Sequence, residues 1–273
     1  MSKIIFGTRG SDLARTQTNI VATQLLSAHP GLTVDTVIIK TTGDQRLDVS
    51  LSAPGVLEKG LFTKELEEAL LAGTIDAAVH SLKDLPTSQP DGLILAAILE
   101  RANPSDVLIS KHPGGLAGLP TQACVATSSP RRRAQLLHLR EDLTTTEIRG
   151  NVPTRLRKLA EDSTLDGLLL AQAGLDRLGH HIIPAGLHLT VIPEILPAPG
   201  QGAIAVECRA DDTRIVDLLH VLHHEDTARC VTAERDLLHS LGGGCSLPLG
   251  ALATIENGEV RVRTFLPKDF PIS

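Results

Sequence analysis

Short apolar runs rich in β-branched residues alternate with longer amphipathic segments along most of this chain. Apolar runs bounded by turn residues are typical of buried strands, and they occur at residues 3–8, 33–42, 74–82, 92–99, 123–129, 144–150 and 165–174. Segments 12–29 and 62–73 have the spacing of amphipathic helices. Strands that alternate with helices predict parallel α/β units.

The segment FTKELEEALLAG, residues 62–73, illustrates the helical pattern. Its apolar residues Phe62, Leu66, Ala69 and Leu70 share one face of a helix, and Gly73 follows as a stop signal. We therefore expect this helix to pack one face against a core and to end at the glycine.

The pattern changes in the last quarter of the chain. A predicted helix at residues 226–241 leads into the loop LGGGCSLPLG, residues 241–250. Residues 249–265 predict a hairpin that turns at ENGE, because Asn-Gly between alternating apolar residues is a strong hairpin signal. We therefore predict two α/β domains followed by a small α+β domain.

Composition limits the classes of function. The chain of 273 residues carries a net charge of −6 and has four Phe but neither Trp nor Tyr. An acidic chain almost without aromatic rings lacks both the charge and the stacking platforms of a nucleic-acid binder. No apolar run reaches membrane-spanning length, and the first residues lack a secretory signal pattern, so we predict a cytoplasmic protein.

The four cysteines have different surroundings, and we expect free thiols because none are spaced as C-x-x-C. Cys124 and Cys208 lie in apolar runs and Cys230 lies in a predicted helix, so these three are interpreted as small buried hydrophobes. Cys245 instead follows three glycines. Glycines cost backbone entropy, so this loop predicts a thiol that another group approaches closely.

His220 and His224 are four residues apart and lie near Cys230, a spacing compatible with zinc. A zinc site of this kind needs a second pair of ligands at similar spacing, and none follows. We interpret these histidines as part of a solvated helix face and predict no metal site.

Three predicted strand-to-helix turns carry arginines. The first turn, GTRGSDLA, holds Arg9 and Ser11. In the second, ATSSPRRRAQLL, Ser129 is a predicted N-cap and Pro130 the first helical residue, followed by Arg131, Arg132 and Arg133. In the third, EIRGNVPTRLRKLA, Arg149 is placed at a strand end and Arg155 and Arg157 in the first helical turns.

Arginines at helix N-termini oppose the helix dipole, so they indicate a bound anion rather than stabilisation of the helix. Arginine also suits bidentate recognition of carboxylate or phosphate. A single such turn is equally well explained by solvated arginines. Three at the strand ends of an α/β sheet predict a polyanionic ligand, with RNA disfavoured by the composition.

Lys83 and Asp84 are adjacent at the end of a predicted strand in AVHSLKDLPT, residues 78–87. An isolated Lys-Asp pair is usually a surface ion pair or part of a turn. Because this pair shares the strand edge with the arginine turns, Asp84 is also a candidate to face a cation that develops during a reaction.

Together these motifs resemble those of the hydroxymethylbilane synthases, also called porphobilinogen deaminases, of tetrapyrrole biosynthesis. The resemblance covers the chain to about residue 265, in the order TRGSDLA, GLFTKELEEALLAGTIDAAVHSLKDLPT, ATSSPRRRAQL, IRGNVPTRLRKL, AGLDRLG, PGQGAIAVECR and GGGCSLPLGA.

The resemblance implies two α/β domains like those of periplasmic binding proteins and a small α+β C-terminal domain. It implies a discontinuous first domain, residues 1–101 and 201–222, to which the strand GAIAVEC returns. The second domain is expected at residues 102–200. The third, residues 223–273, is expected to bear the cofactor and to be shorter than is usual in the family.

The resemblance also implies a reaction and a covalent cofactor. Cys245 is expected to carry a dipyrromethane through a thioether, on which four porphobilinogens condense head to tail with release of ammonia. Hydrolysis then frees hydroxymethylbilane. The partner is thus a small molecule, with no nucleic acid or membrane, and we expect a monomer.

By motif position, the resemblance assigns roles to residues of this chain. Asp84 and Lys83 are the expected catalytic residues, with Asp84 bonding pyrrole N–H groups and stabilising the cationic azafulvene. The expected cofactor-binding residues are Cys245, Lys83, Asp84, Ser129, Arg131, Arg132 and Gly150. The expected substrate-binding residues are Arg9, Ser11, Arg149, Arg155 and Arg177.

A different class of function remains open at this point. A non-catalytic binder of small organic polyanions on the same scaffold would use the arginine turns equally well. It would give no reason for the combination of Asp84 with Cys245.

Overall fold

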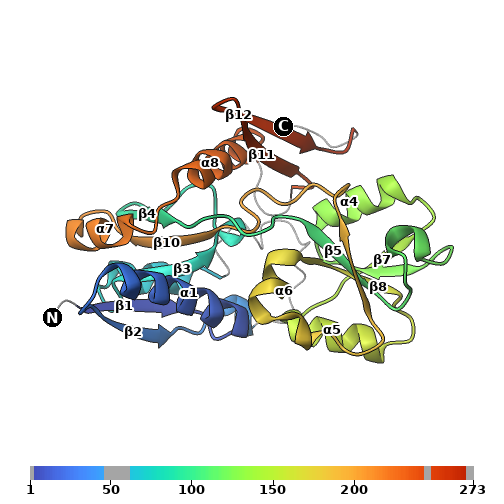
Figure 1. Ribbon diagram of the computed structural model, residues 1–273, viewed down its shortest axis with the longest axis horizontal. Helices are drawn as coiled ribbons and strands as arrows, with labels where there is room; N and C mark the ends of the chain where they lie inside the picture. Colours follow the sequence, from blue (N-terminus) through green and yellow to red (C-terminus); the bar gives the residue numbers. More distant parts are fainter. Residues whose placement is uncertain (1–2, 46–61, 243–246, 269–273) are drawn as a thin grey trace.

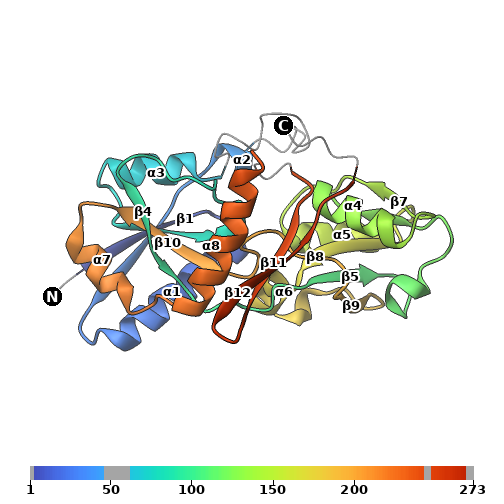
Figure 2. The same ribbon diagram turned by 90° about the horizontal axis from the view of Figure 1, so that it is seen from above.

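The computed structural model describes residues 3–45, 62–242 and 247–268, which form two lobes side by side with a smaller C-terminal unit over their junction (Figure 1). Figure 2 shows the C-terminal helix and hairpin lying across the line where the lobes meet. Cys245 lies outside the described residues.

The first lobe is built around a mixed sheet whose strands, in the described residues, have the order β2-β1-β3-β10-β4. Its strands are β1 (Lys3–Thr8), β2 (Thr33–Ile38), β3 (Ala77–Ser81), β4 (Leu93–Ile98) and β10 (Ile204–Arg209). Its helices are α1 (Asp12–Ala28), α2 (Thr42–Gln45), α3 (Lys64–Leu71), the 3-10 turn η1 (Leu82–Asp84) and α7 (Thr213–His220).

Helices cover both faces of this sheet. Val21 of α1 and Ile215 of α7 share a buried cluster with Phe6 on one face, while Leu66 and Leu70 of α3 pack on the other. The apolar face predicted for residues 62–73 is thus buried at these two leucines, and Gly73 ends the segment with a φ of +69°.

The second lobe repeats the plan with the strand order β7-β6-β8-β5-β9. Its strands are β5 (Asp106–Ser110), β6 (Cys124–Ala126), β7 (Thr144–Thr146), β8 (Gly167–Ala171) and β9 (His188–Ile192). Its helical segments are η2 (Gly115–Gly118), α4 (Pro130–Leu139), α5 (Val152–Glu161), α6 (Gln172–Leu178) and η3 (His180–Ile182).

The sheets are mixed: the predicted parallel units are present, and each lobe also contains one antiparallel strand. β10 runs antiparallel to β3 and β4, and β5 runs antiparallel to β8 and β9. Both are the first strand after the chain crosses between lobes, so each starts at the junction, whereas their neighbours end there.

Two crossover segments connect the lobes and lie against each other. The amide of Ala102 in the first donates to the carbonyl of Gly202 in the second at 3.2 Å. A Cβ on Gly202, whose φ is +90°, would meet the Ala102 oxygen at 2.5 Å, so this approach requires glycine.

The C-terminal unit consists of α8 (Glu225–Ser240) and a hairpin of β11 (Gly250–Glu256) and β12 (Glu259–Phe265). Asn257 and Gly258 have φ values of +53° and +82°, so the predicted turn is confirmed as one that needs left-handed residues. Together with the two sheets, this unit confirms the predicted fold class.

Buried Glu234 joins α8 to both crossovers. Its carboxylate accepts from Arg101 Nη1 and Nη2 at 2.7 and 3.0 Å, from the Gly200 amide at 2.8 Å and from the Ala253 amide at 2.7 Å. The C-terminal unit is thereby fixed to the junction of the lobes.

Candidate active site between the lobes

The topology brings the predicted site residues of both lobes to one place. The carboxyl end of β4 leads into the first crossover, and β1 and β3 run parallel to β4, so they also end at the junction. By the same argument β6, β7 and β8 end there from the other side, parallel to β9. Ligands of open α/β sheets bind at such carboxyl ends.

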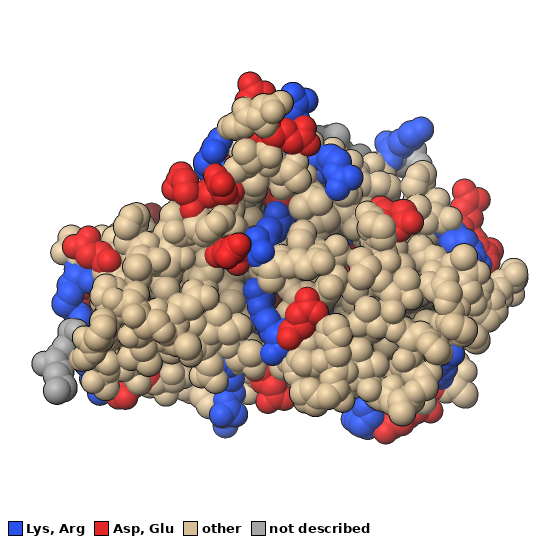
Figure 3. Space-filling view, in the orientation of Figure 1, with Lys and Arg blue, Asp and Glu red and all other residues tan. Residues whose placement is uncertain are grey.

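Figure 3 shows basic and acidic side chains interleaved along the middle of one face, where the lobes meet. On this face, neither sign forms a continuous patch at the junction.

Lys83 and Asp84 form the end of η1, directly after β3. Lys83 is half-buried, its Nζ donates to Oε1 of Gln201 at 3.4 Å, and Asp84 is exposed. Burial and the charge of nearby Arg132 lower the pKa of Lys83 to about 8. The Lys-Asp pair therefore lies within the electrostatic reach of the second lobe's arginines.

Arg131 and Arg132 are buried at the start of α4 and pair with Asp106, the first residue of β5. Arg131 Nη1 donates to Asp106 Oδ2 at 2.7 Å and to the Leu196 carbonyl at 2.6 Å. Arg132 donates from Nε and Nη2 to Asp106 and from Nη1 to the Leu169 carbonyl.

This pairing divides the roles of the two arginines. All three nitrogens of Arg132 have a protein acceptor, whereas the buried Nε of Arg131 has no hydrogen-bond partner among the described residues. Although burial alone would raise it, the two guanidinium groups hold the pKa of Asp106 well below its usual range. Of the two side chains, Arg131 is thus the one with a buried nitrogen that no described residue engages.

The turn before α5 supplies a second cationic group. Arg155 Nε donates to the Gly150 carbonyl at 2.7 Å, and burial with the nearby charges of Arg132 and Arg149 lowers the pKa of Arg155 to about 10. Nη2 of Arg149 is buried without a hydrogen-bond partner in the described part of the chain. The carboxylate of Asp84, in the first lobe, raises the pKa of Arg155 by its negative charge, so it lies close to this guanidinium.

Gly150 shapes this turn. Its φ is +116°, and a Cβ there would meet Thr154 Cγ2 at 2.7 Å. The N-terminus of α5 begins beside it, with Asn151 accepting from the Thr154 amide at 3.0 Å. As Asn151 caps α5, Ser129 caps α4, because its hydroxyl accepts from the Arg132 amide at 3.4 Å. The predicted N-cap and the helix start at Pro130 are thus confirmed.

The remaining predicted residues flank this cluster. Ser11 caps α1 by accepting from the Ala14 amide at 3.3 Å. The Arg9 guanidinium lies 4.1 Å from the centre of the Phe62 ring. Arg177, at the end of α6, donates from Nη2 to the Gly202 carbonyl in the crossover at 2.7 Å, and burial lowers its pKa.

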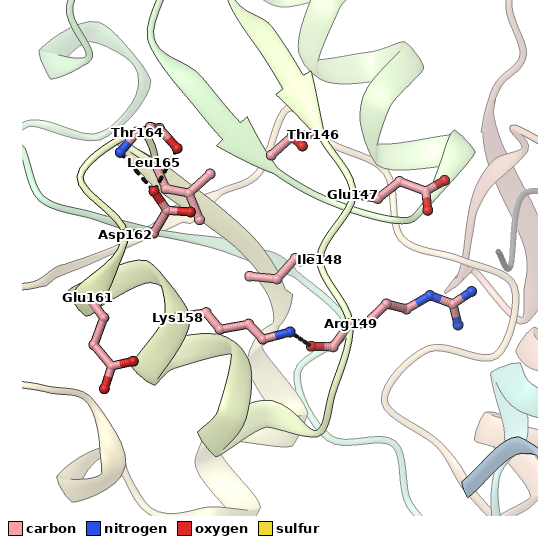
Figure 4. Close-up of a pocket in the computed structure, with 9 residues that line it drawn as sticks. All are labelled: Thr146, Glu147, Ile148, Arg149, Lys158, Glu161, Asp162, Thr164 and Leu165. Carbon is pink, nitrogen blue, oxygen red and sulfur yellow. Dashed lines mark hydrogen bonds between the residues drawn. The ribbon is translucent and has the colours of Figure 1, made fainter. Parts of the chain in front are cut away.

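A separate pocket of 580 Å³ lies beside β7 and the far half of α5. Lys158 Nζ donates to the Arg149 carbonyl there, while Glu161 and Asp162 supply negative charge (Figure 4). The Arg149 guanidinium extends away from this pocket in Figure 4. This pocket therefore fits the predicted anion site less well than the junction of the lobes does.

The junction fits a group that carries several carboxylates. Burial first, and then the charge of neighbouring arginines, lowers the pKa values of Lys83 and Arg155, so several cationic groups share a poorly hydrated region. Buried guanidinium nitrogens on Arg131 and Arg149 lack a hydrogen-bond partner in residues 3–45, 62–242 and 247–268. Carboxylates would relieve the crowding and accept from these donors.

Sequence reasoning missed two residues of the junction, Asp106 and Gln201. A carboxylate at the start of the apolar run DVLIS was the available signal for Asp106, because buried charges are normally paired. Gln201 lies between two glycines with positive φ. These glycines are a weaker signal that the backbone holds the Gln201 side chain in a defined direction. Both are fully buried.

Among the described residues, the helices include none long and apolar enough to span a lipid bilayer. The free thiols of Cys208 and Cys230 are buried, and that of Cys124 is partly buried. Burial raises the pKa of Cys208 to about 11, so this thiol stays protonated. Cys208 and Cys230 are thus confirmed as small buried residues, while Cys124 packs against a core cluster and is only partly buried.

Solved structures align loosely with the whole chain. A periplasmic solute binding protein of the TRAP type from Desulfovibrio salexigens is 12% identical, covers 88% of this chain and 78% of its own, and has a TM-score of 0.48. A likeness at this level bears neither on function nor on the site.

Sequence comparisons are far closer. Residues 4–217 match the family model "Porphobilinogen deaminase, dipyromethane cofactor binding domain", and residues 228–268 match "Porphobilinogen deaminase, C-terminal domain". The porphobilinogen deaminase of Syntrophomonas wolfei is 49% identical over 96% of this chain and 84% of its own length. That of Moorella thermoacetica is 50% identical over 94% and 80%, respectively. The chain belongs to the porphobilinogen deaminase family.

Proposed function

We propose that this protein is a hydroxymethylbilane synthase. It condenses four porphobilinogen molecules head to tail on a dipyrromethane attached to Cys245, releases ammonia at each step and hydrolyses off the product. The observation that supports this proposal most directly is the convergence of Lys83, Arg131, Arg149 and Arg155 around Asp84 and Asp106 at the facing sheet edges.

The cationic side chains bind the acetate and propionate groups of the pyrroles. Arg9, Ser11, Arg149, Arg155 and Arg177 are the proposed substrate-binding residues. Arg149 has a buried nitrogen to donate, and the crowding around Arg155 eases when a carboxylate arrives. A charge-assisted contact of this kind is both strong and directional.

Lys83, Asp84, Ser129, Arg131, Arg132 and Gly150 are proposed to hold the dipyrromethane. When bound, that group supplies the pyrrole end to which the first substrate is joined. Arg132 acts here mainly through Asp106, since its nitrogens are engaged by protein acceptors, and Arg131 donates from Nε. Ser129 and Gly150 keep the two helix starts in place.

Asp84 is the proposed catalytic carboxylate, with Lys83 beside it. Loss of ammonia from porphobilinogen leaves a cation, and a carboxylate already oriented next to it lowers the barrier. The exposed position of Asp84 at the tip of η1 leaves its oxygens accessible to a ring N–H. The neighbouring cations hold the substrate's carboxylates at the same time.

The domain division is proposed as residues 1–101 with 201–222, 102–200 and 223–273. The position of β10 between β3 and β4 supports the discontinuous first domain. We further propose a cytoplasmic monomer whose partner is porphobilinogen, without nucleic acid or membrane. The interleaved charges at the junction support a small multivalent ligand over a polyanionic strand.

Intact mass spectrometry of the purified protein tests the proposal. The enzyme is expected to exceed its sequence mass by two pyrrole units and to react with Ehrlich's reagent. Cys245→Ser should lose both signals, while Cys124→Ser, Cys208→Ser and Cys230→Ser keep them. A protein with the bare sequence mass that still binds organic polyanions would instead be the non-catalytic binder.

A further inference from the structure

Gln201 connects the two lobes through its side chain. It lies fully buried in the second crossover, and its Oε1 accepts from Lys83 Nζ of the first lobe at 3.4 Å. Its Nε2 donates to Asp106 Oδ1 of the second lobe at 2.7 Å and to the Pro104 carbonyl at 2.7 Å. One amide group therefore joins the Lys83 ammonium to the carboxylate that pairs with Arg131.

The backbone around Gln201 fixes the direction of this side chain. Its amide donates to the Ala198 carbonyl at 2.9 Å, and its carbonyl accepts from Arg101 Nε at 2.8 Å. The amide of Gly200, the preceding residue, is held by Glu234 at 2.8 Å. The backbone that carries this side chain is therefore held in place on both sides, and the Gly200 contact ties it to the C-terminal unit.

Lys83 needs such an orienting contact because its surroundings disfavour its charge. Arg131 and Arg132 of α4 oppose the ammonium, whereas Asp84 on its own turn and Asp106 of β5 favour it. A carbonyl oxygen that accepts from the ammonium favours the charged form. The Gln201 amide supplies that oxygen and at the same time holds Asp106 in place.

We propose that Gln201 is a positioning residue that keeps the Lys83 ammonium charged and aimed at the junction of the lobes. It does so by joining Lys83 to Asp106 across the crossover. The inference rests on the proposed function only for the use made of Lys83, since the contacts themselves do not depend on the reaction.

Competitive labelling with acetic anhydride tests the proposal. Acetylation of Lys83 is followed by peptide mass spectrometry between pH 6 and 11, with the exposed Lys64 as an internal reference. The full-length protein is compared with Gln201→Leu, Gln201→Glu and the control Gln135→Leu. Gln135 is also buried and tethers α4 to the crossover, but within the described residues its side chain hydrogen-bonds only to the backbone of Leu196.

The wild-type midpoint is expected near pH 8. Gln201→Leu should lower the midpoint by about one pH unit. A hydrogen bond to a charged group contributes about 1.5 kcal/mol or more, and one pKa unit corresponds to about 1.4 kcal/mol. Gln201→Glu keeps an acceptor oxygen, so its midpoint should stay at or above the wild-type value. Gln135→Leu should leave the midpoint unchanged.

A wild-type midpoint in Gln201→Leu, or an equal fall in Gln135→Leu, would overturn the proposal. If Gln201→Leu does not fold, a fall of the midpoint in Gln201→Glu would overturn it equally. Because labelling of Lys83 requires neither substrate nor turnover, this outcome is separate from that of the intact-mass test. The proposed function can therefore fail while Gln201 still positions Lys83, and the reverse also holds.

Discussion

Asp106 accepts two hydrogen bonds from Arg132, from Nε at 3.1 Å and from Nη2 at 2.8 Å, in the parallel arrangement that suits a guanidinium and a carboxylate. The pair is buried, and Arg131 adds a third donor. Two buried guanidinium groups need a buried carboxylate beside them, because water does not solvate their charges in the interior.

Asp106→Asn should therefore destabilise the protein by about 3–5 kcal/mol, since it leaves two buried cations without their counter-ion. The measurement is the free energy of unfolding in urea at pH 7. A change within about 0.5 kcal/mol would show that the guanidinium groups are hydrated and that the pairing is dispensable.

The stability lost in Asp106→Asn should depend on pH. The pKa of Asp106 is depressed in the folded state, so the ionised carboxylate stabilises the protein fully above its ordinary pKa of 3.8. That stabilisation is lost as the pH falls below 3.8 towards the lower, folded-state pKa. The stability difference between wild type and Asp106→Asn should thus be constant from pH 7 to 5 and shrink below about pH 4.

Loss of the buried Glu234 carboxylate should cost more unfolding free energy than loss of a carboxylate from an exposed ion pair. Glu234→Ala should cost about 3–5 kcal/mol of unfolding free energy, because Arg101 and two backbone amides lose a buried acceptor. Glu161→Ala is the matched control, since it breaks an exposed pair with Arg157 and should cost less than about 1 kcal/mol. Equal losses in the two variants would contradict the assignment of Glu234 as an anchor.

Local features of the site could be predicted from the sequence because they depend on a few neighbouring residues. Ser129 followed by Pro130 determines where α4 begins, and Asn257-Gly258 determines the hairpin turn. The position of Lys83 and Asp84 after a strand follows in the same way from the run that ends at Ser81.

Features that depend on distant pairing could not be predicted. Asp106 meets Arg132 across 26 positions, and Gln201 meets Lys83 across 118. The direction of β5 and β10 follows from the side on which the crossover delivers them, which no local pattern of apolar residues encodes. For this reason the sequence places Arg131 and Arg132 together among the cofactor-binding residues, whereas the structure gives them different protein contacts.

Gly150→Ala should weaken substrate binding and destabilise the turn by about 1–3 kcal/mol. The substitution adds a Cβ 2.7 Å from Thr154 at a φ of +116°. Gly186→Ala is the control, because its φ of +85° gives backbone strain but its Cβ would meet nothing within 4 Å. Michaelis constants for porphobilinogen that are equally affected in both variants would show that the contact with Thr154 is unimportant.

Substrate affinity should fall as the pH rises through 8. Besides its proposed role toward the dipyrromethane, Lys83 is one of the cations next to Asp84 that are proposed to hold the substrate's carboxylates. Its pKa of about 8 means that half of its charge is lost at that pH. If Lys83 is the single titrating group, the Michaelis constant should rise about fivefold between pH 8 and 9. Lys83→Arg, which stays charged, should remove this rise; if the rise persists in that variant, another group is responsible.

Asp84 distinguishes binding from chemistry. Asp84→Asn keeps the size and an acceptor oxygen but removes the charge, so cofactor and substrate should still bind. If charge stabilisation of the developing cation dominates, turnover should fall by about 10²–10³-fold, as for other lost electrostatic contacts. Asp142→Asn removes a carboxylate paired with Arg140 after the end of α4, and it should react at the wild-type rate.

The decisive measurement for Asp84 is single-turnover release of ammonia from enzymes whose intact mass shows the covalent pyrroles. Restricting the comparison to loaded protein removes any effect of the substitution on cofactor assembly. A slow step in Asp84→Asn with an unchanged Michaelis constant would mean that the charge acts in the transition state, because binding alone cannot alter that rate. Equal rates in Asp84→Asn and wild type would make Asp84 a binding residue, and the negative charge that stabilises the cation would have to come from the substrate's own carboxylates.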